Sequence, residues 1–279
     1  MSRFPPLIAL KAAQTHHKGV HVEIPPRKKV GLALGGGVVR GMAHLGVLMA
    51  LERGGIPIDI VTGTSVGSLI GACYSTGRPI DELVGLANGL GWRHMIRPVL
   101  FGDGFFSFSG LERWLVHQLG DLQFSDMARP FAVVASDIDS WRPVILREGR
   151  VALAVRASCS VPGLIQPVEL GGRRLADGGI TDNVPVDAAR LLGADYVIGV
   201  NIFGGLARKR RGPMAMGFAA LETMVRWSGG GLVTADCLIS PAIDDLSYVR
   251  FAHRDKLIAL GVAGAEEKIL EIRTALGLR

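Results

Sequence analysis

The stretch "GLALGGGVVRGMAHLGVL", residues 31–48, places three consecutive glycines, Gly35–Gly37, between an apolar run and an amphipathic one. The apolar run predicts a short strand that ends in glycine. From about residue 41 to 54, apolar side chains recur at helical spacing and predict a helix. A strand that turns through glycine into a helix is a building unit of α/β proteins.

The same unit follows at "IDIVTGTSVGSLIGACYSTG", residues 58–77, with a tight turn at Gly63–Gly67. The remaining predicted elements are helices at 110–120, 150–162, 213–228 and 255–276, two strands around a turn at 137–143, a hairpin at 167–179, a helix and buried strand within 184–203, and a strand at 237–241. Because strands and helices alternate, we expect an α/β fold of three layers, with a mainly parallel central sheet and helices on both faces.

The length and composition favour one large domain. The chain has 279 residues, 48% of them hydrophobic, which is enough for a substantial core. No internal repeat or second domain is visible. We therefore expect a single domain over residues 29–279, preceded by a poorly ordered arm or strap at residues 1–28.

The net charge limits the classes of binding partner that we expect, and the cysteines indicate the redox compartment. The net charge of +6 allows attraction to anionic surfaces, but aromatic residues make up only 6% and do not alternate with the basic cluster at 207–212, so nucleic acid is not expected. The three cysteines have no metal-ligand spacing and predict buried thiols in a reducing compartment. Without a secretory signal, a cytoplasmic protein is expected, with peripheral membrane contact allowed. The uncharged stretch at 60–77 is rich in Thr, Ser and Gly, which indicates a buried strand and helix rather than a membrane span.

Three ligands would explain the glycine run: a phosphate, a dinucleotide or an oxyanion. A phosphate loop needs Lys and Ser/Thr where Met42 and Ala43 stand, and the dinucleotide fingerprint fails at Arg40, where glycine is required. Glycines before a helix also expose backbone N–H groups that favour negative charge. This third possibility, an oxyanion site, requires a nucleophile elsewhere in the chain.

A candidate nucleophile is Ser65. The segment "GTSVG", Gly63–Gly67, matches G-x-S-x-G between a predicted strand and a predicted helix, the context of a nucleophile elbow. The alternative is a structural turn in which Ser65 caps the helix.

A serine nucleophile needs a base, and two residues qualify. His253 follows Ser65 late in the chain, as the order Ser, Asp, His of an α/β-hydrolase triad requires. Asp177, in "LADGGITDNVP", is followed by two glycines, so its loop can approach another element closely. Taken alone, Asp177 could simply mark a turn.

In combination the motifs are far more specific. GGGxxRG at Gly35–Gly41, GxSxG at Gly63–Gly67 and DGG at Asp177–Gly179 occur in this order and closely resemble the patatin-like phospholipase family, serine acyl hydrolases with a Ser–Asp dyad. The segments "ASCSVPGLIQPV", "DGGITDNVPV" and "LGADYVIGVNI" resemble its bacterial members. The resemblance extends over about residues 29–270 and implies a patatin-like fold.

The resemblance also implies roles for single residues. Ser65 corresponds to the nucleophile, within the elbow glycines Gly63 and Gly67, and Asp177 to the base, followed by Gly178 and Gly179. The loop Gly35, Gly36, Gly37, Val38, Val39, Arg40 and Gly41 corresponds to the oxyanion hole. We expect the N–H groups of Gly36, Gly37 and Val38 as donors, helped by that of Val66. Arg40 would hold the loop or meet a head-group phosphate, and Asn183 would be structural.

The expected function is hydrolysis of a lipid or other acyl ester, of phospholipase, lysophospholipase or esterase type, through an acyl-enzyme and without metal or cofactor. Two alternatives remain: a Ser-His-Asp hydrolase that uses His253, and a regulatory or adapter protein on the same fold. The segment "DGFFSFSG", residues 103–110, together with Phe101, is expected either to form a lid or membrane-touching lip, or to fill the core beneath a loop.

Overall fold

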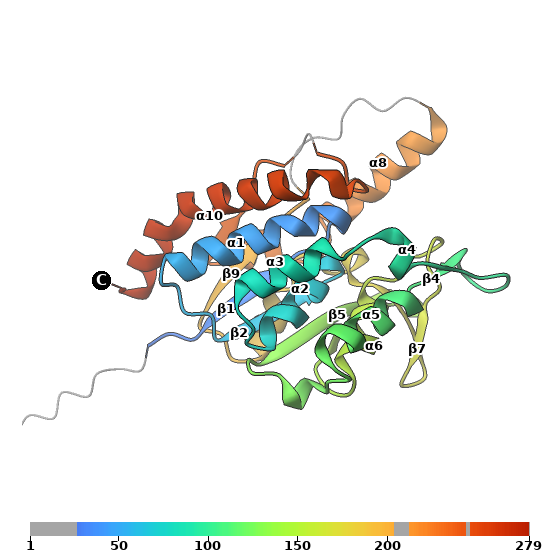
Figure 1. Ribbon diagram of the computed structural model, residues 1–279, viewed down its shortest axis with the longest axis horizontal. Helices are drawn as coiled ribbons and strands as arrows, with labels where there is room; N and C mark the ends of the chain where they lie inside the picture. The colour runs from blue at the N-terminus through green and yellow to red at the C-terminus, as the bar shows by residue number, and fades with distance from the viewer. Residues whose placement is uncertain (1–26, 204–211, 244–245, 279) are drawn as a thin grey trace, which may run out of the picture.

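The computed structural model describes residues 27–203, 212–243 and 246–278 (Figure 1). Most of the predicted arm at 1–28 and of the basic cluster at 207–212 lies outside these residues. The strands are β1 (Val30–Leu34), β2 (Ile60–Thr64), β3 (Arg97–Pro98), β4 (Phe106–Ser107), β5 (Phe131–Asp137), β6 (Arg142–Leu146), β7 (Val168–Leu170), β8 (Arg173–Asp177), β9 (Tyr196–Val200) and β10 (Cys237–Ile239). The α-helices are α1 (Met42–Arg53), α2 (Val66–Ser75), α3 (Ile80–Asn88), α4 (Trp92–Met95), α5 (Ser109–Leu119), α6 (Val151–Ser158), α7 (Val186–Leu191), α8 (Pro213–Arg226), α9 (Gly231–Thr234) and α10 (Arg254–Leu276). Short 3-10 turns are η1 (Val38–Gly41), η2 (Phe124–Asp126), η3 (Gly178–Ile180) and η4 (Phe251–His253).

One large sheet forms the centre, in the order β10-β9-β1-β2-β5-β8-β7, with β6 also paired to β5. The strands from β10 to β5 are parallel, while β6, β7 and β8 run antiparallel to their neighbours. The predicted mainly parallel sheet is confirmed. The two local antiparallel pairs, β5 with β6 and β7 with β8, correspond to the strands predicted around 137–143 and to the hairpin predicted at 167–179, whereas the pairing of β5 with β8 joins distant segments and was not predicted.

Strand β5 brings the ends of β2 and β8 together. Residues 133 and 134 pair with both β2 and β6, so these two strands lie on opposite edges of β5. Residues 135–137 pair with both β6 and β8, which puts β8 on the same edge as β2. Thr64 lies opposite Val134, and Asp177 lies opposite Ala135, the next residue along β5. The chain therefore leaves β2 beside the end of β8.

Helices cover both faces of the sheet, as predicted. The alternation of β1 sends Val30, Leu32 and Leu34 into the larger core, which includes α1 and α2. Ala33 points to the other face and packs in a cluster with residues of α7. The helix α10 lies along α1 (Figure 1).

Two glycines set the spacing of α1 and α10. A Cβ at Gly46 of α1 would stand 1.9 Å from the Ile258 carbonyl oxygen, and a Cβ at Gly261 of α10 would stand 2.0 Å from the Ala43 carbonyl oxygen. The backbones therefore approach each other more closely than any side-chain-bearing pair would allow.

The local predictions are largely confirmed. The helix expected at 41–54 spans Met42–Arg53, the hairpin at 167–179 is β7 and β8, and the closing helices are α8 and α10. All three cysteines are buried and free. None of the helices in the described part of the chain has both the length and the hydropathy needed to cross a bilayer.

Candidate active site

Ser65 occupies the sharp turn between β2 and α2. Its φ of 53° and ψ of −125° lie in a region that residues other than glycine rarely adopt. The two flanking glycines explain how the turn can be so tight: a Cβ at Gly63 would lie 2.5 Å from the carbonyl carbon of Gly67, and a Cβ at Gly67 would lie 2.1 Å from the Leu34 carbonyl oxygen. The geometry is that of a nucleophile elbow.

Ser158, at the end of α6, supports this turn. The Ser65 backbone N–H donates to Ser158 Oγ at 2.8 Å, and Ser158 Oγ donates to the Val134 carbonyl at 2.6 Å. Ser158 thereby ties the elbow to β5. Ser158 was not predicted as a site residue, although it lies in the segment "ASCSVPGLIQPV" that carries part of the family resemblance.

Asp177, at the end of β8, faces Ser65. The Ser65 hydroxyl donates to Asp177 Oδ2 at 2.6 Å, and the Gly179 backbone N–H donates to Asp177 Oδ1 at 2.8 Å. The Asp177 backbone N–H donates to the carbonyl of Ser160 at 2.8 Å, so the loop after α6 supports both residues of the pair. The structure thus brings together the two residues that the sequence nominated.

Burial alters the acidity of the carboxyl group. Ser65 is 8% and Asp177 is 7% exposed. Loss of hydration raises the pKa of Asp177 to about 6, although the hydrogen bonds from Ser65 and Gly179 act in the opposite direction. At neutral pH the group is mostly ionised and can accept a proton.

The glycine loop runs beside Ser65, and some of its backbone N–H groups have hydrogen-bond acceptors whereas others do not. The Gly35 N–H donates to the Val200 carbonyl at 3.0 Å, and the Gly36 N–H donates to the Asn183 side-chain and backbone oxygens at 3.1 and 3.3 Å. Among the residues that the structure describes, the N–H groups of Gly37, Val38 and Val66 have no acceptor. Val38 is held at a φ of 54°, which is strained for a β-branched residue.

His44, one turn into α1, holds the loop from behind. Its Nε2 lies 2.8 Å from the Gly35 carbonyl, which can only accept, so Nε2 carries the hydrogen. The ring is fully buried, and this lowers its pKa to about 4. His44 is therefore neutral at pH 7 and fixes the position of Gly35.

Arg40 is buried rather than directed to solvent. It donates to the Leu246 carbonyl through Nε at 3.1 Å and through a terminal nitrogen at 2.8 Å, and its guanidinium lies 3.6 Å from the centre of the Tyr248 ring. It is 3% exposed. These contacts suit the expectation that Arg40 holds the loop, and they leave little of it for a head-group phosphate. Gly41 packs against Val66, and Gly178 packs against the carbonyl of Val134.

His253, the alternative base, lies in η4 and lines the same cavity as Ser65. Within the described residues, it makes no hydrogen bond to Ser65 or to Asp177. The hydroxyl of Ser65 reaches the carboxylate directly, so no histidine stands between them.

A large apolar cavity opens above the pair, with a volume of about 1090 Å³. This volume is slightly above the usual range for ligand sites in proteins, about 300–1,000 Å³. Its wall includes Met42, Leu69, Met95, Phe106, Phe108, Leu111, Val161, Ile165, Val225 and Phe251. Ser65, Asp177 and Asn183 are among the polar residues of the same wall. Among the described residues, no group of three or more His, Cys, Asp or Glu side chains is placed to hold a metal ion.

The side chains of the phenylalanine-rich segment lie in two different environments. Phe106 and Phe108 line the cavity, and Phe108 is buried. Phe101 and Phe105, at the tip of the β3–β4 hairpin, are 87% and 69% exposed. The expectation of core residues holds for Phe108 and fails for the tip.

Comparison with known proteins places these motifs in one family. The family model for patatin-like phospholipase matches residues 32–190, a range that includes Ser65 and Asp177. A region of 202 residues, 69% of the chain, is 37% identical to the lysophospholipase nte1 of Aspergillus fumigatus and 36% identical to that of Aspergillus oryzae. That region makes up only 13% of each fungal protein.

A solved structure shows the same fold. The crystal structure of VipD from Legionella pneumophila matches 90% of this chain and 67% of its own, with a TM-score of 0.60 and 14% sequence identity. At that identity the likeness concerns the fold alone. It confirms the predicted patatin-like architecture.

Proposed function

The chain belongs to the patatin-like phospholipase family, and on this basis we propose that it is a serine acyl hydrolase acting on lipid esters through a Ser65–Asp177 dyad. The observation that carries the proposal is the hydrogen bond of 2.6 Å between Ser65 Oγ and the buried Asp177 carboxylate, both of which line a large apolar cavity. A nucleophile within hydrogen-bond reach of its base is the arrangement that covalent catalysis requires.

In the first step, Asp177 accepts the hydroxyl proton while Ser65 Oγ bonds to the ester carbonyl carbon. The carbonyl oxygen becomes an oxyanion, and we assign its stabilisation to the N–H groups of Gly37 and Val38, with that of Val66. Gly36, expected earlier as a donor, is left out because its N–H already donates to Asn183. The intermediate collapses, the ester C–O bond breaks, and Asp177 returns the proton to the departing alcohol.

In the second step, water removes the acyl group. Asp177 takes one proton from water as its oxygen attacks the acyl carbonyl, and the same N–H groups hold the second oxyanion. Breakage of the acyl–Oγ bond returns the proton to Ser65 and releases the carboxylic acid. A carboxylate is a weak base for this task, and the raised pKa of Asp177, about 6, brings it closer to what general-base catalysis at neutral pH needs.

The substrate class follows from the cavity and the relatives. The apolar wall suits an acyl chain, and Ser65 and Asp177 line the same cavity, so an ester carbonyl could lie beside Ser65 while the chain contacts the wall. The fungal relatives are named lysophospholipases. We infer that a lysophospholipid is the substrate to test first, and that the protein meets it by peripheral contact with a lipid surface. The cytoplasmic location stays a prediction.

The test measures fatty-acid release from lysophosphatidylcholine and hydrolysis of a soluble p-nitrophenyl ester. Ser65→Ala and Asp177→Asn should each abolish both activities. Ser75→Ala is the matched control, because Ser75 is a buried serine at the far end of α2 whose hydroxyl has no partner among the described residues. Full activity in Ser65→Ala would refute the proposal. If a fluorophosphonate did not label Ser65 in the folded protein, the regulatory or adapter alternative would be favoured.

A further inference from the structure

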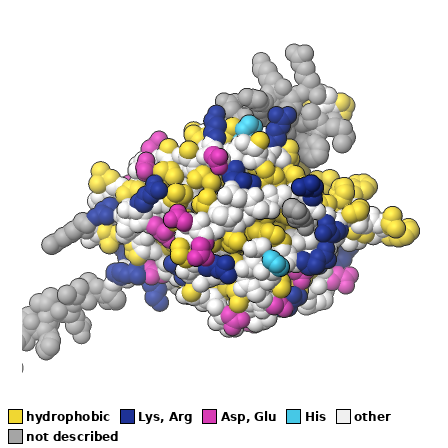
Figure 2. Space-filling model, viewed as in Figure 1, with side chains coloured by type: hydrophobic (Ala, Val, Ile, Leu, Met, Phe, Trp, Pro, Cys, Tyr) yellow, Lys and Arg dark blue, Asp and Glu magenta, His cyan; other side chains and the backbone are white. Residues whose placement is uncertain are grey.

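The β3–β4 hairpin presents a cluster of apolar side chains to solvent. At its tip, Leu100, Phe101 and Phe105 are 91%, 87% and 69% exposed. Figure 1 shows the hairpin projecting from the body, and Figure 2 shows hydrophobic side chains gathered at that end of the molecule. We call these three residues the hairpin tip. So much apolar surface on one projecting segment marks a contact site.

The tip is continuous with the mouth of the cavity. Phe106, which follows the tip directly, lines the cavity and is itself 38% exposed. The Phe106 N–H donates to the Leu164 carbonyl at 3.0 Å, and Leu164 is a second cavity residue that is 42% exposed. Whatever covers the tip therefore also meets the entrance to the site.

The tip is held by one hydrogen bond within the hairpin and by two contacts from neighbouring segments. The Val99 N–H donates to the Phe105 carbonyl at 3.1 Å, and Gln166 Nε2 donates to the Phe101 carbonyl at 2.9 Å. Asp103, an acidic residue between the phenylalanines, is paired with Arg174 at 3.1 Å. The carbonyl groups of Phe101 and Phe105 therefore have partners, which lowers the cost of moving them into an apolar medium.

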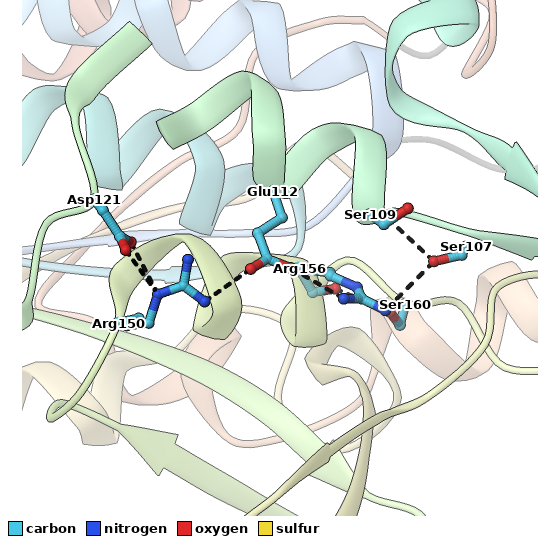
Figure 3. A network of polar contacts seen from close by, with 7 residues as sticks. All are labelled: Ser107, Ser109, Glu112, Asp121, Arg150, Arg156 and Ser160. Carbon is cyan, nitrogen blue, oxygen red and sulfur yellow. Dashed lines mark hydrogen bonds and ion pairs between the residues drawn. The ribbon is translucent and has the colours of Figure 1, made fainter. Parts of the chain in front are cut away.

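The base of the hairpin is fixed to the body by a polar network (Figure 3). Arg156 of α6 reaches Ser107, at the end of β4, and Glu112 of α5, at 3.4 and 3.0 Å. Glu112 also receives Arg150 at 3.0 Å. The tip is thus a firm projection rather than a free loop.

Three exposed arginines, which we call the arginine collar, belong to segments beside the hairpin or the cavity wall. Arg93 and Arg97, on α4 and β3, are exposed, and so is Arg250, which lines the cavity. Trp92 Nε1 donates to the Val249 carbonyl at 3.0 Å and so brings the segment of Arg250 beside α4. Apolar side chains with an arginine collar suit insertion between the head groups of an anionic lipid layer.

We propose that the hairpin tip is a docking site for an anionic membrane surface, into which Leu100, Phe101 and Phe105 insert so that the cavity mouth faces the lipids. This inference rests on the proposed function, because the docking site explains how a lipid ester would reach Ser65. The arginine collar supplies long-range attraction, and the apolar tip supplies the contact that survives salt.

The binding test uses the full chain carrying Ser65→Ala, so that no lipid is consumed, and sucrose-loaded vesicles with or without 30% phosphatidylglycerol in phosphatidylcholine. Adding Phe101→Ser and Phe105→Ser should weaken vesicle binding by about 10-fold for each side chain removed. The matched control is Leu270→Ser, an apolar residue 77% exposed on α10, whose C-terminal end lies opposite β4 in Figure 1. Tip variants that bind as tightly as the parent, or a parent that binds neutral vesicles equally well, would overturn the proposal.

A second measurement does not require that the variants Phe101→Ser and Phe105→Ser fold as the parent does. The three native cysteines are buried, so Phe105→Cys can be labelled selectively with an environment-sensitive fluorophore. Its emission should shift to the blue on anionic vesicles, whereas the same label at Leu270→Cys should not respond. An unshifted Phe105→Cys label contradicts insertion. If vesicles bind in this way but the wild-type chain releases no fatty acid, the docking site stands and the proposed function fails.

Asn183 carries a second, independent inference. Its Oδ1 accepts from the Gly36 N–H at 3.1 Å, which fixes the orientation of the amide and leaves the NH₂ group on the other side. The residue is fully buried and lines the cavity with Ser65, yet Nδ2 has no acceptor among the described residues. A Cβ at Gly36 would lie 2.8 Å from Asn183 Oδ1 and 3.2 Å from Ser65 Cβ, so Gly36 is in close contact with both residues.

We propose that the Asn183 amide is a side-chain donor to the oxyanion, in addition to holding Gly36. This goes beyond the structural role expected from the sequence. Buried donors are normally satisfied, and an acceptor that exists only during the reaction would satisfy this one.

The Asn183→Asp variant separates the two roles, because it keeps an oxygen for Gly36 and removes the NH₂ group. The expected result is a fall in kcat of about 10²-fold on a soluble ester, measured on the plateau of the pH profile, with KM little changed and an equal loss in the rate of fluorophosphonate labelling of Ser65. Asn183→Ala should lose at least as much. If Asn183→Asp stays within threefold of wild type while Asn183→Ala is impaired, the side chain only holds the loop.

Discussion

Ser65 and Asp177 are joined by one hydrogen bond of 2.6 Å, although 112 positions separate them in the chain. Both sit where a strand ends beside β5, and both are buried. The contact therefore depends on the sheet, and its chemistry depends on the charge of one carboxyl group.

The pH dependence of hydrolysis should report that charge. Protonated Asp177 cannot accept the Ser65 proton, and its pKa is raised to about 6 by burial. We expect kcat/KM to fall below an apparent pKa near 6, and to be about tenfold lower at pH 5 than on its plateau. The measurement is a pH–rate profile with a soluble ester.

Two variants serve as controls for this profile. The pKa of the Asp182 carboxyl is raised to about 7, by burial and then by the nearby Asp187. Asp182→Asn should leave the acidic limb in place, as should His253→Ala. A limb that disappears in His253→Ala would return the histidine triad to consideration.

Ser158→Ala should impair both activity and stability. The substitution leaves the Ser65 N–H and the Val134 carbonyl without their shared partner in a buried site. An unmet buried donor costs about 1–3 kcal/mol, and a displaced nucleophile loses about 10- to 100-fold in kcat. Urea unfolding and steady-state kinetics measure the two effects. A wild-type kcat in Ser158→Ala would show that the turn at Ser65 keeps its conformation without the Ser158 hydroxyl.

His44 should make stability sensitive to acid. Its pKa is lowered from 6.5 to about 4 in the folded chain, so its contribution to stability is complete above pH 6.5 and is lost as the pH falls toward 4. The loss amounts to about 3 kcal/mol. His44→Gln, which keeps a donor for Gly35, should reduce the difference between unfolding free energies at pH 7 and pH 4.5. Asp177 and Asp182 act in the opposite sense in both proteins, so the comparison isolates His44.

Gly46→Ala should destabilise the protein by about 3 kcal/mol, because the new methyl group would overlap the Ile258 carbonyl and push α10 away from α1. Gly85→Ala is the matched control. Gly85 is also in a helix, α3, but its Cβ would meet nothing within 4 Å, and the change should stabilise by about 0.5–1 kcal/mol. Thermal unfolding of both variants measures the contrast. Equal melting temperatures of the two variants would mean that α10 does not pack closely against α1 at Gly46.

The sequence predicted what is local. Periodicity placed β1, α1, β2 and α2, and the glycine motifs indicated tight turns around Ser65. The two glycines after Asp177 already favoured it over His253 as the base, and the resemblance to a family then assigned it that role. The edge of β5 that pairs first with β2 and then with β8 joins distant segments, and no local pattern encodes it.

Other site features escaped prediction because they depend on three-dimensional neighbours. Asn183 gave no sign that it would take up the Gly36 N–H, which changes the set of donors available to an oxyanion. The phenylalanines at 101–108 are the same residue type, yet Phe105 is exposed and Phe108 is buried. The difference depends on the β3–β4 hairpin, which carries Phe105 at its tip.

The shared edge of β5 also governs when this chemistry can exist. A chain that has left the ribosome only as far as β5 already carries the serine, the elbow and the glycine loop, but it has no carboxylate beside them. Strand β8 must be synthesised and must add, antiparallel, to the edge that β2 leaves open. Under the proposed mechanism, a chain truncated before β8 has no base for Ser65, and the Ser65–Asp177 pair forms only when β8 joins the sheet.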